Sequence, residues 1–190
     1  HACVVGRYLI EEWARVPVEF DIASEWIYRN PVIDEHTLVI AISQSGETAD
    51  TLAAVRDARE RGARVLSIVN VQGSSLTRES DAVLLTDAGP EIGVASTKAF
   101  TTQLLALSLL ALDVGAVRGR LDAAALNAGV EALRRLPLKM QECLEQDTSV
   151  YEAAERFSRT SDFLFLGRGI NYPIALEGAL KLKEISYVHA

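Results

Sequence analysis

The strongest signal in this chain lies in the segment Leu38-Val-Ile-Ala-Ile-Ser-Gln-Ser-Gly-Glu-Thr-Ala-Asp-Thr51. Residues 38–42 form a short apolar run rich in β-branched side chains, which is typical of a strand buried on both faces of a parallel sheet. Polar residues follow at once, and residues 46–61 then show a helical pattern that stops at Gly62. We therefore expect a buried strand that passes through a tight polar turn into a helix.

Small polar side chains gather at this strand-to-helix turn. They are Ser43, Gln44, Ser45 and Thr48, with Gly46 among them. Backbone N–H groups and the helix dipole favour an anion at a helix N-terminus, and a glycine lets a ligand approach the backbone closely. The carboxyl end of a strand is also where open parallel sheets bind ligands. The turn therefore predicts a binding site for a phosphate group.

Two common phosphate motifs are missing from the turn, which narrows the class of ligand. No Gly-Lys-Ser/Thr sequence closes it as in a P-loop, and no Gly-x-Gly-x-x-Gly marks a dinucleotide site. Hydroxyl groups without a lysine suit a phosphomonoester better than a nucleoside triphosphate. A simpler alternative stays open, in which Ser45 is an ordinary helix N-cap and Glu47 only complements the helix dipole.

The composition is that of an acidic globular chain. It has 190 residues, 49% of them hydrophobic, with a formal net charge of −7 and a pI of about 5.0. Lysine and arginine do not cluster, so we expect no nucleic-acid partner. The three histidines and two cysteines are scattered without metal-ligand spacing. We therefore expect no metal site, no disulfide framework and a cytoplasmic location.

The segment from Thr102 to Val117 is strongly apolar. We expect this helix to be shorter than a bilayer span and to be buried in the core or in an oligomer interface. The chain is therefore expected to have no membrane partner.

Strands and helices alternate along the first half of the chain. We expect strands at 18–22, 38–42, 64–69 and 82–86, and helices at 1–14, at 46–61 and from about residue 96. Alternation at short spacing favours right-handed crossovers and a three-layer α/β fold, in which helices cover both faces of a parallel sheet.

Longer helices follow, expected at 122–145 and 150–159. An apolar strand at 163–166, a Gly-Arg-Gly turn and a helix from Tyr172 onward then repeat the earlier pattern. We therefore divide the chain into a first unit, 1–146, whose own first strand is missing, and the beginning of a second similar unit, 147–190. We expect the chain to be a piece of a longer protein.

A second polar segment, Glu91-Ile-Gly-Val-Ala-Ser-Thr-Lys-Ala-Phe100, leads into the long apolar helix. We expect Ser96 and Thr97 at the N-terminus of this helix, where hydroxyl and N–H groups face outward. A plain serine cap is the simpler interpretation. The approach loop is longer than a cap needs, however, and polar loops over the end of a sheet often carry function.

The last helix holds the only credible candidates for acid–base chemistry. At the helical rotation of about 100° per residue, Glu177, Lys181 and Glu184 fall within an arc of about 60°. The alternative is a solvent-exposed face stabilised by i,i+4 and i,i+3 pairs, and residue types alone favour it. The position of this helix, after a glycine turn that follows an apolar strand, favours a role near a ligand.

Together these segments resemble the isomerase (SIS) domain of the glutamine–fructose-6-phosphate aminotransferase family, the glucosamine-6-phosphate synthases. The matching stretches are 43–52, 91–103, 166–169 and 172–186, with Ile22-Ala-Ser-Glu25. The first marks only the wider sugar-isomerase (SIS) superfamily, whereas the later ones mark the aminotransferases more narrowly. The resemblance covers essentially the whole chain and implies the flavodoxin-like topology of SIS domains.

The resemblance also implies roles for individual residues. Those that match the sugar-phosphate loop, and the groups that hold the sugar, are Ser43, Gln44, Ser45, Thr48, Val94 through its backbone, and Ser96. Glu184 matches the isomerising base and Lys181 a lysine near the chemistry at C2.

Several elements of the family do not occur in these 190 residues. They are a Cys-Gly-Thr-Ser loop expected just before His1, the histidine of Gly-Glu-Leu-Lys-His-Gly, a C-terminal Schiff-base lysine and the glutamine-hydrolysing domain. The resemblance therefore implies one and a fraction SIS units of a larger enzyme.

The implied reaction converts fructose 6-phosphate to glucosamine 6-phosphate with ammonia released from glutamine. It requires no metal or organic cofactor, and the implied partners are the sugar phosphate, a glutaminase domain and a second copy of the chain. Two rival functions stay open: another SIS-type sugar-phosphate isomerase, and a non-catalytic module that binds sugar phosphates. Glu184 disfavours the module, and the segments 91–103 and 172–186 disfavour the simple isomerase.

Overall fold

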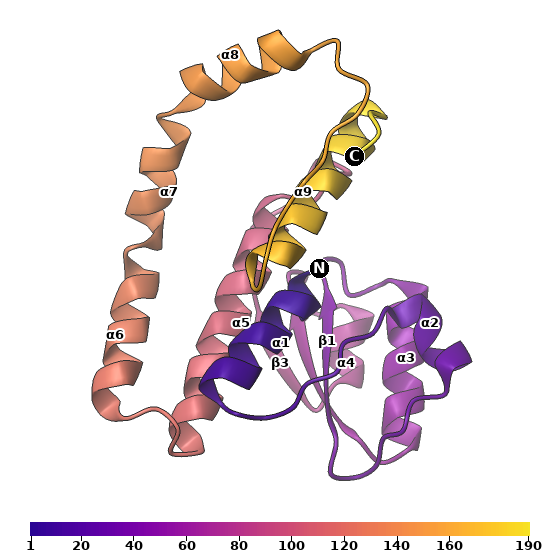
Figure 1. Cartoon of the computed structure of the whole chain (residues 1–190). Helices are drawn as coiled ribbons and strands as arrows, with labels where there is room; N and C mark the ends of the chain where they lie inside the picture. Colours follow the sequence, from indigo (N-terminus) through magenta and orange to yellow (C-terminus); the bar gives the residue numbers. More distant parts are fainter. The chain divides into compact units, whose positions relative to one another are not determined.

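The computed structural model describes residues 1–190 (Figure 1), and the contacts within the chain divide it into two compact units. The sheet unit consists of Ala2–Arg7 and Pro17–Ser108. The helical unit consists of His1, Tyr8–Val16 and Leu109–Ala190. Helices α1 (Ala2–Trp13) and α5 (Lys98–Val117) each contribute residues to both units. We describe each unit by itself.

The sheet unit is built on three parallel strands, β1 (Leu38–Ser43), β2 (Arg64–Val69) and β3 (Ala82–Leu85). Their order is β1-β2-β3, so β2 pairs with both neighbours, and Ile68 lies beside Ile42 on one side and Leu84 on the other. The prediction of an α/β fold with a parallel sheet is confirmed. The polar turn at 43–48 accordingly lies at the carboxyl edge of this sheet.

Apolar side chains from alternate strand positions form two clusters, because successive side chains of a strand point to opposite faces. Members of the first cluster come from the sheet, from the residue before β2, and from α3 (Ala49–Glu60) and α4 (Ser75–Glu79): Ala41, Leu52, Val55, Ala58, Ala63, Val65, Val69 and Leu76. The second joins Ile68 to Ala2 of α1 and Leu107 of α5, with Ile40 and Ile42 packed against it. Helices thus cover both faces of the sheet.

Two predicted strands are wrong. Residues 18–22 are irregular, and Phe20 and Ile22 of this segment are 46% and 64% exposed. Residues 163–166 form no strand either, and only an isolated bridge between Asp162 and His189 lies beside them. Both segments have an apolar pattern that suits a strand, but no neighbouring strand pairs with them through the ladder of hydrogen bonds that a sheet requires.

The long helix predicted at 122–145 is two helices, α6 (Ala123–Arg134) and α7 (Leu136–Leu144). Pro137 lies in the first turn of α7, and it has no N–H to donate to the carbonyl four residues earlier. The remaining helices are α2 (Ala23–Arg29), α8 (Asp147–Phe157) and α9 (Asn171–Ser186), and Tyr187 ends α9 in the left-handed conformation.

The expectation that the apolar helix falls short of a bilayer span is also wrong. Helix α5 has 20 residues and is the one helix whose length and composition would allow it to cross a membrane. Core helices of soluble proteins pass the same test, and Ala99, Leu107, Ala111 and Leu112 of α5 are buried. These positions are eight, four and one residues apart, and 22% of the most apolar window of α5 is buried.

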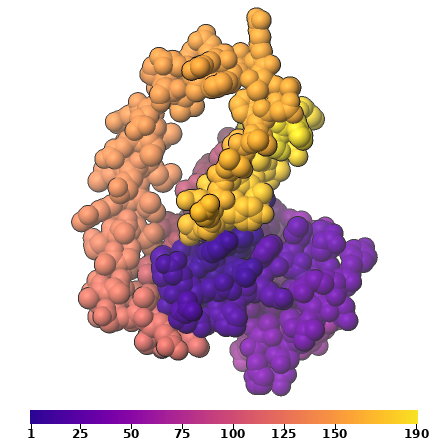
Figure 2. Space-filling view, viewed as in Figure 1, coloured from indigo at the N-terminus to yellow at the C-terminus, as the bar shows by residue number.

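The helices α6, α7 and α8 leave their apolar side chains exposed. None of the three contains a buried residue, and Figure 2 colours this part of the chain from salmon to orange. Leu138 and Leu144 of α7 are each 70% exposed. Within the helical unit these helices therefore contribute little core.

We expect Ile68→Ala to be strongly destabilising, because Ile68 is fully buried in the central strand. Loss of its methyl groups and the cavity left behind should lower the free energy of unfolding by about 2–5 kcal/mol. Chemical denaturation measures this change. Ile22→Ala is the matched control at a 64% exposed position, and equal losses in the two variants would contradict the described core.

Candidate functional site

Hydroxyl groups fold the turn after β1 into a compact loop, residues 43–48, which we call the phosphate loop. The Ser43 side chain is buried at the end of the strand, and its Oγ accepts a hydrogen bond from the Gly46 N–H at 3.0 Å. Ser45 Oγ accepts one from the Glu47 N–H at 3.2 Å. Each hydroxyl thus bonds a backbone donor two or three residues later, as serines in tight turns do.

The helix behind the loop begins later than the sequence predicted. Its N-cap is Thr48 rather than Ser45, and the Thr48 side chain makes no capping hydrogen bond. The first backbone bond into the helix runs from the Leu52 N–H to the Thr48 carbonyl at 3.0 Å. The first-turn N–H groups of residues 49–51 therefore have no intrahelical acceptor, and the simple alternative of a Ser45 cap is wrong.

These features together describe an anion-binding geometry. Ser43, Gln44 and Ser45 are buried or half-buried, and Thr48 is exposed where the helix starts. Uncapped N–H groups at a helix N-terminus attract negative charge. The loop is therefore suited chemically to the phosphate that the sequence predicted there.

Gly46 brings the loop against the chain that follows β2. Its φ is +69°, a conformation that glycine adopts easily. A Cβ at this position would collide with Ser74 Oγ and would touch Val69 Cγ2 at 3.0 Å. Close packing and backbone conformation therefore both require glycine.

Asn70, directly after β2, connects the loops that follow all three strands. Its N–H donates to the Gln44 carbonyl at 3.1 Å. Its side chain accepts from the Ala88 N–H at 2.8 Å and donates to the Gly89 carbonyl at 2.8 Å. The sequence analysis missed this residue, although a lone asparagine at a strand end is a recognisable turn-forming signal.

The second polar segment leads into α5, which begins at Lys98 and not at Ser96. Val94 is fully exposed and Ser96 is half-buried. The helix is capped by Glu91, whose carboxylate accepts from the Ala99 N–H at 3.0 Å, so the simple serine cap is not formed. Val94 and Ser96, which the resemblance assigns to sugar binding, therefore lie in the loop that follows β3. The bond of Glu91 to α5 fixes this loop.

The predicted acid–base candidates, Glu177, Lys181 and Glu184, lie in the helical unit and form a row of ion pairs along α9. Lys181 Nζ lies 2.7 Å from Glu184 Oε2 and 3.4 Å from Glu177 Oε1. Glu177 Oε2 lies 2.7 Å from Nδ1 of His1. The side chains of Glu177 and Lys181 are only 13% and 20% exposed, so the alternative of a fully solvated stripe is wrong for these two residues.

The two carboxylates keep Lys181 charged. Partial burial alone would lower the pKa of Lys181, but the hydrogen bond from Lys181 to Glu184 and the charge of Glu177 outweigh burial and raise it. Glu184, with a 35% exposed side chain, is the member of this chain that a ligand reaches most easily.

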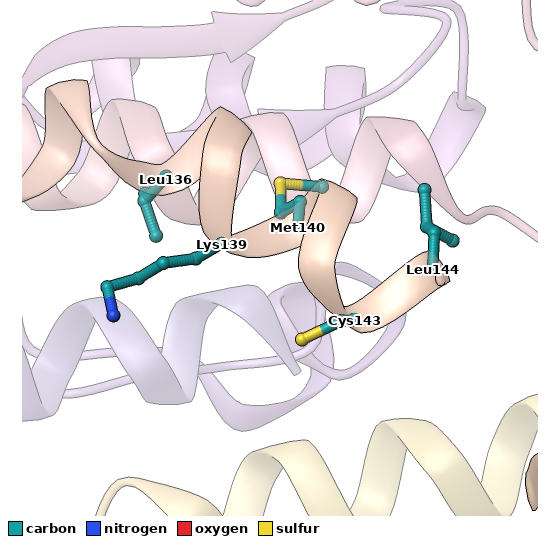
Figure 3. Close-up of a pocket in the computed structure, with 5 residues that line it drawn as sticks. All are labelled: Leu136, Lys139, Met140, Cys143 and Leu144. Carbon is teal, nitrogen blue, oxygen red and sulfur yellow. The ribbon is translucent and has the colours of Figure 1, made fainter. Parts of the chain in front are cut away.

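Figure 3 shows a pocket that does not qualify as a functional site. All its lining residues belong to α7: Leu136, Lys139, Met140, Cys143 and Leu144. One amine and one thiol do not form the convergent polar set that orients a small ligand. No group of three or more histidine, cysteine, aspartate or glutamate side chains gathers to hold a metal ion, and both cysteines are free.

We expect Gly46→Ala to disturb the phosphate loop. The left-handed conformation costs a non-glycine residue about 1–2 kcal/mol, and the new methyl group would in addition collide with Ser74. Thermal unfolding measures the loss. Gly119→Ala is the matched control, because Gly119 has a φ of +65° with open space around it. A loss no greater than that of the control would contradict the close packing at Gly46.

Comparison with known proteins identifies the family. A family model described as SIS domain matches residues 1–113. The glutamine–fructose-6-phosphate aminotransferase (isomerizing) of Symbiobacterium thermophilum is 57% identical over 190 residues, which are 100% of this chain and 31% of that protein. The protein of the same name from Pseudomonas putida is 58% identical over 191 residues, again covering 100% of this chain and 31% of its own length.

A solved structure agrees with these relatives. The C-terminal domain of glucosamine-fructose-6-phosphate aminotransferase from Francisella tularensis is 46% identical, with a TM-score of 0.97, over 100% of this chain and 54% of that one. The chain thus spans about a third of the length of the relatives it matches. Because the family model matches more than half of the residues, and the fold agrees, this chain belongs to the SIS domain family.

Proposed function

We propose that this chain is the isomerase part of an enzyme that converts fructose 6-phosphate and glutamine to glucosamine 6-phosphate and glutamate. The observation that carries the proposal is the phosphate loop at the carboxyl edge of the sheet. This loop occurs in a chain that aligns over its whole length with two glutamine–fructose-6-phosphate aminotransferases, at 57% and 58% identity.

The phosphate group would be bound by the phosphate loop. Ser43, Gln44, Ser45 and Thr48 supply three hydroxyls and one amide, and the first turn of α3 supplies free N–H groups. This set holds a dianionic phosphate without a lysine, through donors that are already oriented. The Val94 backbone and the Ser96 hydroxyl would hold the sugar from the loop between β3 and α5.

The isomerisation would be carried out by Glu184. Moving a proton between C1 and C2 of the open-chain sugar needs a base within reach of both carbons, and an ionised carboxylate is suited to this work. Lys181, at 2.7 Å from Glu184, would stabilise negative charge that develops near C2. This reaction redistributes hydrogen without net oxidation, and the resemblance implies no metal or organic cofactor for it.

Ammonia would come from glutamine hydrolysis in another part of the protein. The relatives are about three times as long as this chain, which leaves room for a glutaminase domain in them. We infer further that the protein is a cytoplasmic homodimer, with exposed apolar side chains of α5 such as Leu105 and Leu109 available for contact between copies.

We expect Ser45→Ala combined with Thr48→Ala to weaken the binding of fructose 6-phosphate. Each lost hydrogen bond to the charged phosphate is worth about 1–3 kcal/mol, so the pair is worth about 2–6 kcal/mol, a loss of affinity of roughly 30- to 10⁴-fold. Isothermal titration calorimetry on the protein in its natural length measures the affinity. Unchanged affinity in a folded double variant would contradict the assignment of the phosphate site.

We expect Glu184→Gln to slow isomerisation by about 10²–10⁴-fold while sugar-phosphate affinity barely changes, because glutamine keeps the shape but accepts no proton. Exchange of solvent hydrogen into the sugar isolates this step from glutamine hydrolysis. Glu177 is unsuitable as a control, since its carboxylate bonds to His1 and Lys181. Glu142→Gln, at an exposed position of α7, serves instead. Equal rates for Glu184→Gln and the control would rule out Glu184 as the base.

A further inference from the structure

The phosphate loop contains one residue that does not suit an anion site. Glu47 follows Gly46 directly and lies next to Thr48, where its negative charge would repel a phosphate. Its side chain therefore needs an explanation beyond the general preference for acidic residues at helix N-termini.

The Glu47 carboxylate bonds to α4 and not to α3, the helix that directly follows the loop. Glu47 Oε1 accepts a hydrogen bond from the Ser75 N–H at 2.7 Å. Ser75 is the first residue of α4, so its N–H has no partner within that helix. The Ser75 hydrogen bond, assisted by the charge of Arg78, lowers the pKa of Glu47, and the group stays ionised at neutral pH.

Two backbone hydrogen bonds join the same two segments. The Leu76 N–H donates to the Gly46 carbonyl at 3.0 Å, and the Asn70 N–H donates to the Gln44 carbonyl at 3.1 Å. Residues 44, 46 and 47 are thus each bonded to the chain between residues 70 and 76. Glu47 provides the only one of these three attachments that depends on a side chain.

Ser74 packs closely against the phosphate loop at Gly46. Its side chain is only 3% exposed and lies where a side chain of residue 46 would be, and its hydroxyl has no hydrogen-bond partner. Unpartnered buried hydroxyls are uncommon because they lose their bonds to water. The loop therefore rests on Ser74 by packing, and its position depends on the hydrogen bonds on either side.

We propose that Glu47 is a positioning residue of the sugar-phosphate site: its bond to Ser75 holds the phosphate loop against α4, so that the loop's donors converge on the phosphate while its own charge points away. This inference rests on the proposed function of the loop. It predicts that loss of the bond weakens binding even though Glu47 itself never touches the ligand.

Substitutions at Glu47 test the proposal from the loop side. In the protein at its natural length, Glu47→Ala should weaken fructose 6-phosphate binding by on the order of tenfold, measured by calorimetry, and should raise KM more than it lowers kcat. Glu47→Gln keeps an acceptor oxygen and should restore most of the affinity. Glu60→Ala, at an exposed position near the end of α3, should leave the affinity unchanged.

Substitutions at Ser75 test the same proposal at the donor of the hydrogen bond, and they leave the sequence of the phosphate loop unchanged. Ser75→Pro removes the N–H donor, and proline fits the first position of a helix. The extended conformation of Ser74 (φ −65°, ψ 165°) also suits a residue before proline. Ser75→Ala keeps the N–H and loses only the hydroxyl, which accepts a hydrogen bond from Arg78 at 3.0 Å. We expect the proline variant to bind as weakly as Glu47→Ala, and the alanine variant to bind much more tightly than the proline variant.

The double variant Glu47→Ala/Ser75→Pro decides whether the two residues act through one bond. Its loss of affinity should equal that of either single variant, because a bond can be removed only once. Additive losses would overturn the proposal. So would a fall in unfolding temperature with unchanged affinity in the single variants, which would mean that the bond serves stability alone.

A failure of the proposed function has a different signature. If Ser45→Ala with Thr48→Ala leaves fructose 6-phosphate binding intact, the ligand is not bound by this loop, and the positioning role falls with it. If that double variant binds weakly while Glu47→Ala and Ser75→Pro bind normally, the site stands and only the role of Glu47 is overturned.

Discussion

The parallel pairing of β2 with both neighbours is the constraint on which the candidate site depends. Because the three strands run in the same direction and in register, their carboxyl ends meet at one edge of the sheet. The phosphate loop, the segment from Asn70 to Leu76 and the loop between β3 and α5 all begin at that edge. Two apolar clusters, one on each face, hold the strands in place. A site made of three separate loops is therefore fixed by one rigid element, as in other open α/β sheets.

Charged side chains in this chain act mainly as connectors between backbone segments. Glu47 caps α4, Glu91 caps α5, and Asp81 accepts from the Val65 N–H at 2.7 Å. Each carboxylate satisfies a backbone donor at the beginning of a helix or strand, where the regular ladder supplies no acceptor. The ion-pair chain on α9 is different, since Lys181 lies between two carboxylates that hold it in the charged state. In these ion pairs a lysine that is 20% exposed lies between carboxylates that are 13% and 35% exposed.

Local patterns predicted the sheet well and the contacts between loops poorly. The apolar runs at 38–42 and 64–69 predicted two strands almost to the residue, although only the central strand β2 is largely buried and β1, at the sheet edge, is mostly half-buried. The same kind of run failed at 163–166, since a strand also needs a neighbour, and that is not a property of the segment itself. The arc of Glu177, Lys181 and Glu184 follows from helical geometry and was found correctly. The bonds of Glu47 to Ser75 and of Asn70 to Gln44 join residues 26 or more positions apart, and no periodicity reports them.

The packing of Ser74 against Gly46 has a consequence for how such chains can diverge. The space that a side chain at position 46 would need is already filled by the one at position 74, so the two positions share a single volume. A change at either one is constrained by the other, although they belong to different loops of the sheet edge. Gly46 also has a positive φ, so enlarging it remains unfavourable even if position 74 becomes smaller. Variation is therefore expected to be one-sided, with position 74 free to shrink and position 46 held at glycine.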